Sequence, residues 1–158
     1  EAINETGIIG MLLHNLGIEY FKQEDYQNAH IYYGKALKMA DKKTAIFLNR
    51  LYNYLDNSIK GDLQTHKRHL KSAQEGLFFS KALKHPLYQH LFQLLIFQVD
   101  GETDSYYVYL EKEALPFFLS YNQINRINKF GKKLFHYFSD TKQYEKAVQI
   151  SHTFIQRD

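Results

Sequence analysis

The feature that most constrains this fold is a pair of matched helical patterns near the start of the chain. Apolar side chains recur at the three- and four-residue spacing of one helix face, first at Leu13, Leu16, Gly17 and Tyr20, then at Ala29, Tyr33 and Ala36. Only a short polar break over residues 22–25 separates them. Two such segments predict an antiparallel helical hairpin, in which small side chains at Gly17 and Ala29 let the helices approach closely.

This hairpin resembles a tetratricopeptide repeat, whose pattern is W-x2-L-G-x2-Y followed by A-x3-F. Leu13 stands in place of the Trp and Tyr33 in place of the Phe, and the other pattern positions match. Asp41 stands where the repeat usually has its closing Pro. The resemblance implies a helix–turn–helix unit that stacks on further copies of itself.

A weaker copy of the pattern lies near the end of the sequence. It consists of Leu134, Phe138, Tyr144 and Ala147, with Phe135 in the small-residue position. The separation of Tyr26 from Tyr144 fits three steps, each a little longer than the about 34 residues of a standard repeat. We therefore expect stretched or degenerate repeats in between.

The whole chain is predicted to be all-α, a right-handed α-solenoid of about four antiparallel helix pairs. Pro116 lies inside a helical pattern and predicts a kink or an early helix end. No composition shift divides the chain, so we expect one domain over residues 1–158, as a fragment of a longer protein. The expected helices cover residues 8–22, 26–41, 43–57, 62–84, 86–99, 104–119, 121–139 and 142–157.

Composition narrows the functional classes. Two Pro and eight Gly argue against collagen-like, disordered and many-stranded β classes, and the absence of Cys excludes disulfides and thiolate chemistry. A net charge of +3 does not by itself indicate a nucleic-acid partner. The longest tight apolar run, residues 94–97, is far too short to span a membrane. A cytoplasmic protein with no membrane contact is expected.

A polar stripe on the third expected helix is the strongest candidate binding feature. Asn49, Asn53 and Asn57 recur at helical spacing beside an apolar face, and an amide side chain can both donate to and accept from the backbone of an extended peptide. A solvated polar stripe is the alternative. The remaining predicted groove residues are His14, Ile18 and Phe21 in the first helix, Gln89 and Gln93 in the fifth, and Lys129, Lys132 and His136 in the seventh.

Catalytic and cofactor motifs are not found. His66 and His69 are spaced like a ligand pair, but the sequence supplies no third ligand. Neither a metal site, a cofactor nor an enzymatic activity is predicted.

Degenerate repeats, groove asparagines and abundant Tyr and Phe together resemble the C-terminal peptide-binding domain of the RNPP-type peptide-pheromone regulators of Gram-positive bacteria. The resemblance implies a sensor that binds a short signalling peptide in its concave groove, through Asn49, Asn53 and Asn57. It further implies transcriptional regulation and quorum sensing, a possible homodimer, and DNA contact only through a domain absent from this chain. Two alternatives stay open: a constitutive protein–protein interaction scaffold and a response-regulator phosphatase.

Overall fold

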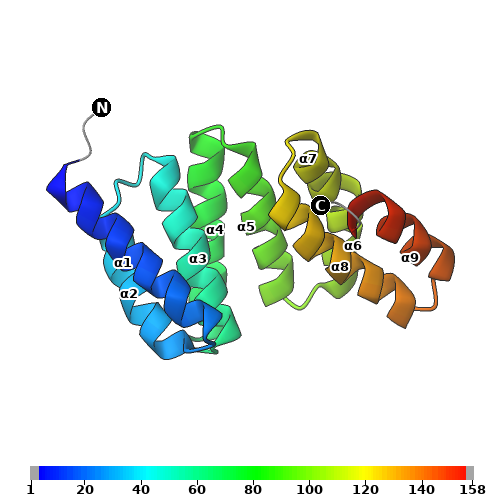
Figure 1. The fold of residues 1–158 in the computed structure, drawn as a ribbon, viewed down its shortest axis with the longest axis horizontal. Helices are drawn as coiled ribbons and strands as arrows, with labels where there is room; N and C mark the ends of the chain where they lie inside the picture. The colour runs from blue at the N-terminus through cyan, green and yellow to red at the C-terminus, as the bar shows by residue number, and fades with distance from the viewer. Residues whose placement is uncertain (1–3, 156–158) are drawn as a thin grey trace. The chain divides into compact units, whose positions relative to one another are not determined.

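The structure, a computed structural model, describes residues 4–155, which form helices joined by short connections (Figure 1). The all-α fold class is confirmed. The elements are α1 (Glu5–Lys22), α2 (Tyr26–Lys38), α3 (Ala45–Lys60), α4 (His66–Ala82), α5 (Pro86–Val99), α6 (Thr103–Tyr109), a π-helical turn (Leu110–Ala114), α7 (Leu115–Ser120), α8 (Ile124–Asp140), α9 (Tyr144–Ile150) and a second π-helical turn (Ser151–Ile155).

Two compact units make up the chain, an N-terminal unit (Glu1–Asp100) and a C-terminal unit (Gly101–Asp158). In the N-terminal unit, α1 packs against α2, α2 against α3, α3 against α4, and α4 against α5. In the C-terminal unit, α7 packs against α8 and α8 against α9. The expectation of one domain over residues 1–158 stays a prediction.

Among the described residues, helix ends agree with the expected segments to within a few residues, with one informative difference at Pro116. The expected end of the last helix, residue 157, lies outside the described residues. The helix that contains Pro116 runs on to Ser120 instead of ending early. Just before it, the Leu115 N–H donates to the carbonyl of Leu110, five residues back, in a π-helical turn. Because proline lacks an N–H and crowds the preceding turn, the wider π geometry accommodates it without ending the helix.

Five turns in the described residues share one backbone geometry. Each has a non-glycine residue at positive φ, between 50° and 61°, at Glu24, Asp62, Lys84, Asn122 and Lys142. In the first turn, the Glu24 N–H donates to the Phe21 carbonyl (2.9 Å) and the Asp25 N–H to the Tyr20 carbonyl (3.0 Å). This pair of bonds is the Schellman motif, which satisfies the last carbonyls of a helix and reverses the chain.

The core of the N-terminal unit depends on close contact between glycines and rings. A Cβ added to Gly17 would lie 2.5 Å from the ring of Tyr33, and one added to Gly76 would lie 2.3 Å from the ring of Phe92. Both rings are buried. Burial as the main cause, together with the negative charge of Asp56, raises the pKa of the Tyr33 hydroxyl to about 12. These glycines let α1 approach α2 and α4 approach α5, as the sequence predicts for Gly17.

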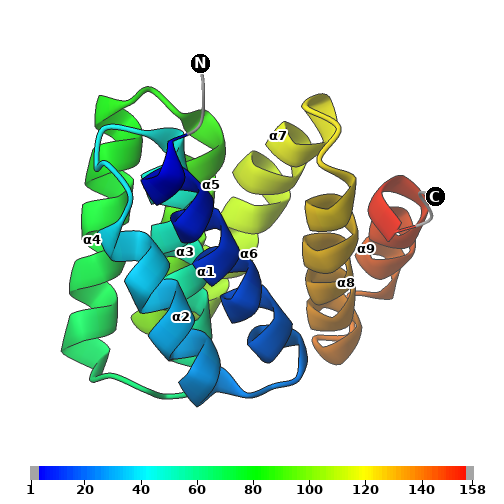
Figure 2. The same cartoon turned by 60° about the vertical axis from the view of Figure 1, so that its left-hand side comes forward.

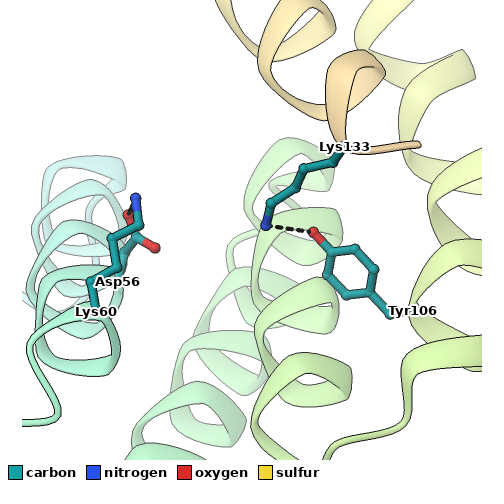
Figure 3. A network of polar contacts seen from close by, with 4 residues as sticks. All are labelled: Asp56, Lys60, Tyr106 and Lys133. Atoms are coloured by element: carbon teal, nitrogen blue, oxygen red, sulfur yellow. Dashed lines mark hydrogen bonds and ion pairs between the residues drawn. The ribbon is translucent and has the colours of Figure 1, made fainter. Parts of the chain in front are cut away.

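The C-terminal unit has its own apolar interior. The rings of Phe118 and Phe130 stack with centroids 5.5 Å apart, and Leu134 beside them is fully buried. The Lys133 ammonium donates to the hydroxyl of the buried Tyr106 (3.3 Å) and lies over the Tyr106 ring (Figure 3). Much of the aromatic content is therefore structural.

Candidate functional site

A pocket of about 580 Å³ opens in the N-terminal unit between the middle of α1 and the first halves of α3 and α5. These are the helices expected to line a groove, and Figure 2 shows α4 on the outer side, at the left edge. The pocket is partly apolar and partly polar. Its lining residues are Met11, His14, Asn15, Ala45, Ile46, Asn49, Arg50, His85, Leu87 and Tyr88.

Asn49 is held in place from the neighbouring helix. Its side-chain Nδ2 donates to the hydroxyl of Tyr88 on α5 at 2.8 Å, and Asn49 is half-buried whereas Tyr88 is buried. Because Nδ2 is engaged, the carbonyl Oδ1 of Asn49 is the atom that remains to accept a hydrogen bond from a ligand.

Asn53 lies one turn further along α3 and contacts α1 in a similar way. Its Nδ2 is 3.2 Å from Nε2 of His14, and both residues are half-buried. Burial, and after it the positive charge of Arg50, lower the pKa of His14, so the ring is neutral at pH 7. With Nε2 as the acceptor the ring proton resides on Nδ1, which has no partner in the described residues.

Arg50 is the most deeply buried charge of the pocket, with 5% of its surface exposed. Its Nη1 donates to the carbonyl of Ala36 near the end of α2 at 2.9 Å. A Cβ added to Gly10 on α1 would lie 2.8 Å from the same nitrogen, so the guanidinium packs directly against the α1 backbone. Burial lowers the pKa of Arg50 from its usual value, but an arginine stays charged.

Other predicted groove residues lie elsewhere in the N-terminal unit. Asn57 has no exposed surface and its Nδ2 donates to the Tyr26 carbonyl at 2.9 Å, so it joins α3 to α2 and is not open to a ligand. Phe21 packs edge-on against Tyr26, with the Lys60 ammonium 4.7 Å from its ring centroid. Lys60 also pairs with Asp56 at 3.4 Å (Figure 3).

The remaining N-terminal residues of the prediction are half-buried and do not line the pocket. Gln89 donates to the Ser80 carbonyl at 3.4 Å, within the α4–α5 hairpin. Ile18 and Gln93 are the other two. Their role as ligand contacts stays a prediction.

Three predicted residues belong to α8 in the C-terminal unit. Lys129, Lys132 and His136 are all exposed, and the Lys129 ammonium lies 5.2 Å from the ring centroid of Phe130. A peptide contact at these residues stays a prediction.

Of the predicted groove residues, His14 and Asn49 line the pocket and Asn53 contacts His14, whereas the lining residues Arg50 and Tyr88 were not predicted. Arg50 directly precedes Leu51 and follows Phe47 by three positions, so its place on the buried face could have been read from helical spacing. Tyr88 offered no comparable signal, because its contact with Asn49 depends on the packing of α5 beside α3.

Within residues 4–155 the structure shows neither a cluster of metal ligands nor a membrane-spanning helix. No group of three His, Asp or Glu side chains there could hold a metal ion, and none of the helices is both long and apolar enough to cross a membrane.

The N-terminal unit consists of helical hairpins with small residues at the hairpin interfaces. Successive hairpins that pack each on the next are typical of helical-repeat proteins. Comparison with known proteins agrees: residues 10–43 match the family model of the Tetratricopeptide repeat. The structure is similar to the apo form of the quorum sensor NprR from B. thuringiensis, with a TM-score of 0.82 and 22% sequence identity. The match covers 98% of this chain and 45% of that chain. No curated protein matches the sequence.

The tetratricopeptide-repeat resemblance is thereby confirmed for residues 10–43, and the likeness to the peptide-pheromone regulators is confirmed for the fold. A fold of this class supports an interaction module. The chain spans less than half of the length of the quorum sensor.

Proposed function

We propose that the N-terminal unit binds a short peptide in an extended conformation along α3. The observation that carries this proposal is the pair of half-buried amides, Asn49 and Asn53, each held through Nδ2 by a ring from a neighbouring helix. Both amides therefore present a fixed Oδ1 acceptor. Fixed acceptors lose little freedom when they bind, which favours affinity.

The spacing of the two amides fits the backbone of such a peptide. Residues four apart on a helix are separated by about 6 Å along its axis. Alternate residues of an extended chain are about 6.6 Å apart and direct their N–H groups to the same side. Asn49 and Asn53 can thus accept from two N–H groups of one peptide, whatever its side chains are.

In the proposed function this binding is regulatory. A peptide that binds one arrangement of the helices better than another shifts their populations, and an attached or partner output domain responds. The likeness to a quorum sensor supports a signalling peptide as the ligand, with transcription as the regulated process and DNA contacted by a separate domain. We extend the proposal to a cytoplasmic location, which suits a chain without Cys.

A selection experiment followed by calorimetry tests this proposal. A pool of randomised heptapeptides is passed over the immobilised protein, and retained peptides are identified by mass spectrometry and titrated one by one. The double variant Asn49→Ala, Asn53→Ala removes two hydrogen bonds of about 1 kcal/mol each, so affinity should fall about 30-fold. Gln27→Ala, an exposed amide on α2, is the matched control and should change nothing.

Two outcomes contradict the proposal. One is the retention of no peptide at all. The other is a double variant that binds the retained peptides as tightly as the unmodified protein.

A second candidate function, a constitutive scaffold, is favoured by the outer face of α1. Ile8, Leu12 and Leu16 lie along this helix with 49%, 58% and 44% of their surface exposed. Adjacent exposed apolar side chains are typical of protein contact sites. If the partner on this face is a second copy of the chain, sedimentation equilibrium should show a dimer that Leu12→Glu converts to a monomer. A monomer before the substitution contradicts this homodimer.

A further inference from the structure

A second, smaller hollow lies on the outer side of the N-terminal unit, at the helix that Figure 2 shows at the left edge. It has a volume of about 350 Å³ and lies between the α2–α3 connection and α4. It shares no lining residue with the pocket between α1, α3 and α5. The residues that define this α4 hollow are Lys42, Lys71, Gln74, Glu75, Phe78 and Phe79.

Two adjacent aromatic rings supply the apolar part of the α4 hollow. Phe79 is half-buried and packs edge-on against the buried Phe47 of α3, with ring centroids 5.6 Å apart. The Phe78 ring lies edge-on to that of Phe79, also with centroids 5.6 Å apart, and 68% of Phe78 is exposed. Because the core holds Phe79 in place, the two rings form a fixed apolar surface. Covering it with an apolar side chain is favourable, since this removes the surface from water.

Two lysines supply the charge of the α4 hollow. Lys71 is exposed on α4 two turns before Phe78, and the Lys42 ammonium lies 6.0 Å from the ring centroid of Phe79. Within residues 4–155 neither lysine forms an ion pair. Glu75 is the one acidic side chain among the described lining residues. The lysines therefore leave a net positive charge beside the rings.

The start of α4 extends this positive charge. Lys67 and Arg68 are exposed, and at four and three residues before Lys71 they share its helix face. The first turn of α4 holds no acidic residue. Cations there are unfavourable, because they meet the positive end of the helix dipole. An anionic partner would offset this repulsion.

The order of these groups along α4 determines the kind of ligand that fits. The lysines and the arginine lie toward the start of the helix, the exposed ring of Phe78 lies toward its end, and Glu75 lies between them. A nucleic acid carries phosphates at regular intervals and would bring one against Glu75. A protein segment can carry its carboxylates on one side of an apolar side chain, so it matches both halves of the hollow.

We propose that the α4 hollow is a docking site for an acidic, apolar segment of a partner protein. One large apolar side chain of that segment covers Phe78 and Phe79. Asp or Glu residues on one side of that side chain pair with Lys42 and Lys71. The proposal goes beyond the proposed function and does not depend on it, because it assigns a contact with a protein partner outside the groove.

Three pools of synthetic nonapeptides test this proposal. Each peptide has a central Leu or Phe, an acetylated N-terminus and an amidated C-terminus, so that no terminal charge contributes. The three residues before or after the centre are acidic in the first pool, Asn or Gln in the second and Lys in the third, and all other positions are Gly or Ser.

Fluorescence anisotropy should show that the acidic pool binds about 5- to 10-fold more tightly than the neutral pool, as expected for two exposed ion pairs. The basic pool should bind more weakly still. The preference for the acidic pool should decrease as the salt concentration rises. Equal affinity for the acidic and neutral pools, or no binding of the acidic pool, would overturn the proposal.

Removing the exposed ring locates the apolar contact. Phe78→Ala leaves a residue that favours helix, so α4 is retained, and acidic peptides should bind about 10-fold more weakly. The matched control is Tyr121→Ala, which removes a ring that is 63% exposed in the C-terminal unit and should have no effect. If Phe78→Ala binds the acidic pool as tightly as the unmodified protein, the assignment is wrong.

Charge reversal gives a result that a loss of folding cannot mimic. The double variant Lys42→Glu, Lys71→Glu should prefer the basic pool to the acidic pool, because the charge of the site is reversed. Glu75→Gln should bind the acidic pool about 2-fold more tightly, since it removes a repelling carboxylate. The matched double variant Lys112→Glu, Lys142→Glu reverses two exposed charges of the C-terminal unit and should keep the acidic preference. The same preference in the Lys42, Lys71 variant contradicts the site.

NMR separates the α4 hollow from the peptide site along α3. Acidic peptides should shift the backbone amide signals of residues 71–79 and leave those of Asn49 and Asn53 unchanged. The variant Asn49→Ala, Asn53→Ala should bind them as tightly as the unmodified protein, so the peptide function can fail while this proposal stands. Shifts confined to α3 would overturn the proposal. So would a single-stranded DNA oligonucleotide that shifts the α4 signals when no acidic peptide does.

Discussion

The hairpins α1–α2 and α8–α9, one in each unit, share a turn but not a packing pattern. Glu24 and Lys142 occupy the same left-handed position, and Ala29 and Ala147 are both buried. In the first hairpin Gly17 lies against the large ring of Tyr33. In the last, the corresponding positions hold a large residue followed by a small one, Phe135 and Ser151.

The difference shows which features of a repeat are needed to form the hairpin and which are needed for sequence comparison to detect the repeat. The turn and the buried alanine suffice to form the hairpin. The order of small and large side chains across the interface can be exchanged between the two helices. Residues 10–43, which keep the usual order, match the family model, whereas the last hairpin lies outside that match.

The largest expected effect on stability comes from removing the aromatic side chain near the end of the first helix of each hairpin. Phe138 is buried, so Phe138→Ala should destabilise the C-terminal unit by about 3–5 kcal/mol. Tyr20 is half-buried and stacks on Tyr32 with centroids 5.4 Å apart, so Tyr20→Ala should cost the N-terminal unit only about 1.5 kcal/mol. Hydrogen exchange of the α9 and α2 amides measures each unit separately. Equal losses would contradict the stated contrast.

A smaller effect tests the glycine of the first hairpin. Gly17→Ala places a methyl group against the Tyr33 ring and should destabilise the N-terminal unit by about 2 kcal/mol through overpacking. Gly34→Ala on α2 is the matched control, because its Cβ meets only an ordinary contact at 3.5 Å. That variant should gain up to about 1 kcal/mol from helix propensity. Urea unfolding should show opposite signs, and two stabilising changes would rule out the close contact.

The turns that the two hairpins share predict equal effects. Glu24→Gly and Lys142→Gly should each stabilise their unit by about 1 kcal/mol, because glycine adopts positive φ without the Cβ penalty. Gln23→Gly, at negative φ one position earlier, should destabilise by about 0.5–1 kcal/mol. Thermal unfolding gives the comparison, and a loss of stability at both turn positions would contradict the Schellman geometry.

The smallest expected effect is a difference in acid sensitivity. Burial is the main cause that lowers the pKa of His14, His30 and His69, all of which lie in the N-terminal unit. The unfolded chain then binds more protons than the folded one, so stability falls as the pH drops through the ordinary histidine pKa of about 6.5. Hydrogen exchange at pH 7.5 and 5.5 should show faster opening of α1 and α3 at the lower pH. Unchanged protection would contradict the depressed pKa values, and His14→Gln should reduce the effect.

Most of the secondary structure could be predicted because hydrophobic spacing determines where helices run. The Schellman turns could not, since Glu24, Asp62, Lys84 and Lys142 are not the glycines that mark such turns. The polar breaks in the hydrophobic pattern predicted where these turns lie but not their backbone geometry.

The candidate site could be predicted only in part. Helical spacing indicates the helix face on which a residue lies but not how deeply that residue is buried. Asn49, Asn53 and Asn57 share one stripe in the sequence, yet the third is fully buried against α2. Arg50 illustrates the opposite case, a charged residue whose burial depends on the close approach of Gly10. Contacts between helices decide both outcomes.

The π-helical turn before Pro116 also bears on how this chain diverged from a regular repeat. A π turn holds one residue more than an α turn, so a helix can accommodate a single extra residue by forming one. An extra residue shifts every later position relative to a fixed period, and the left-handed residues Gly101 and Lys142 are further apart in sequence than Glu24 and Asp62. Length variation of this kind erases a repeat from sequence comparison while leaving its three-dimensional form in place.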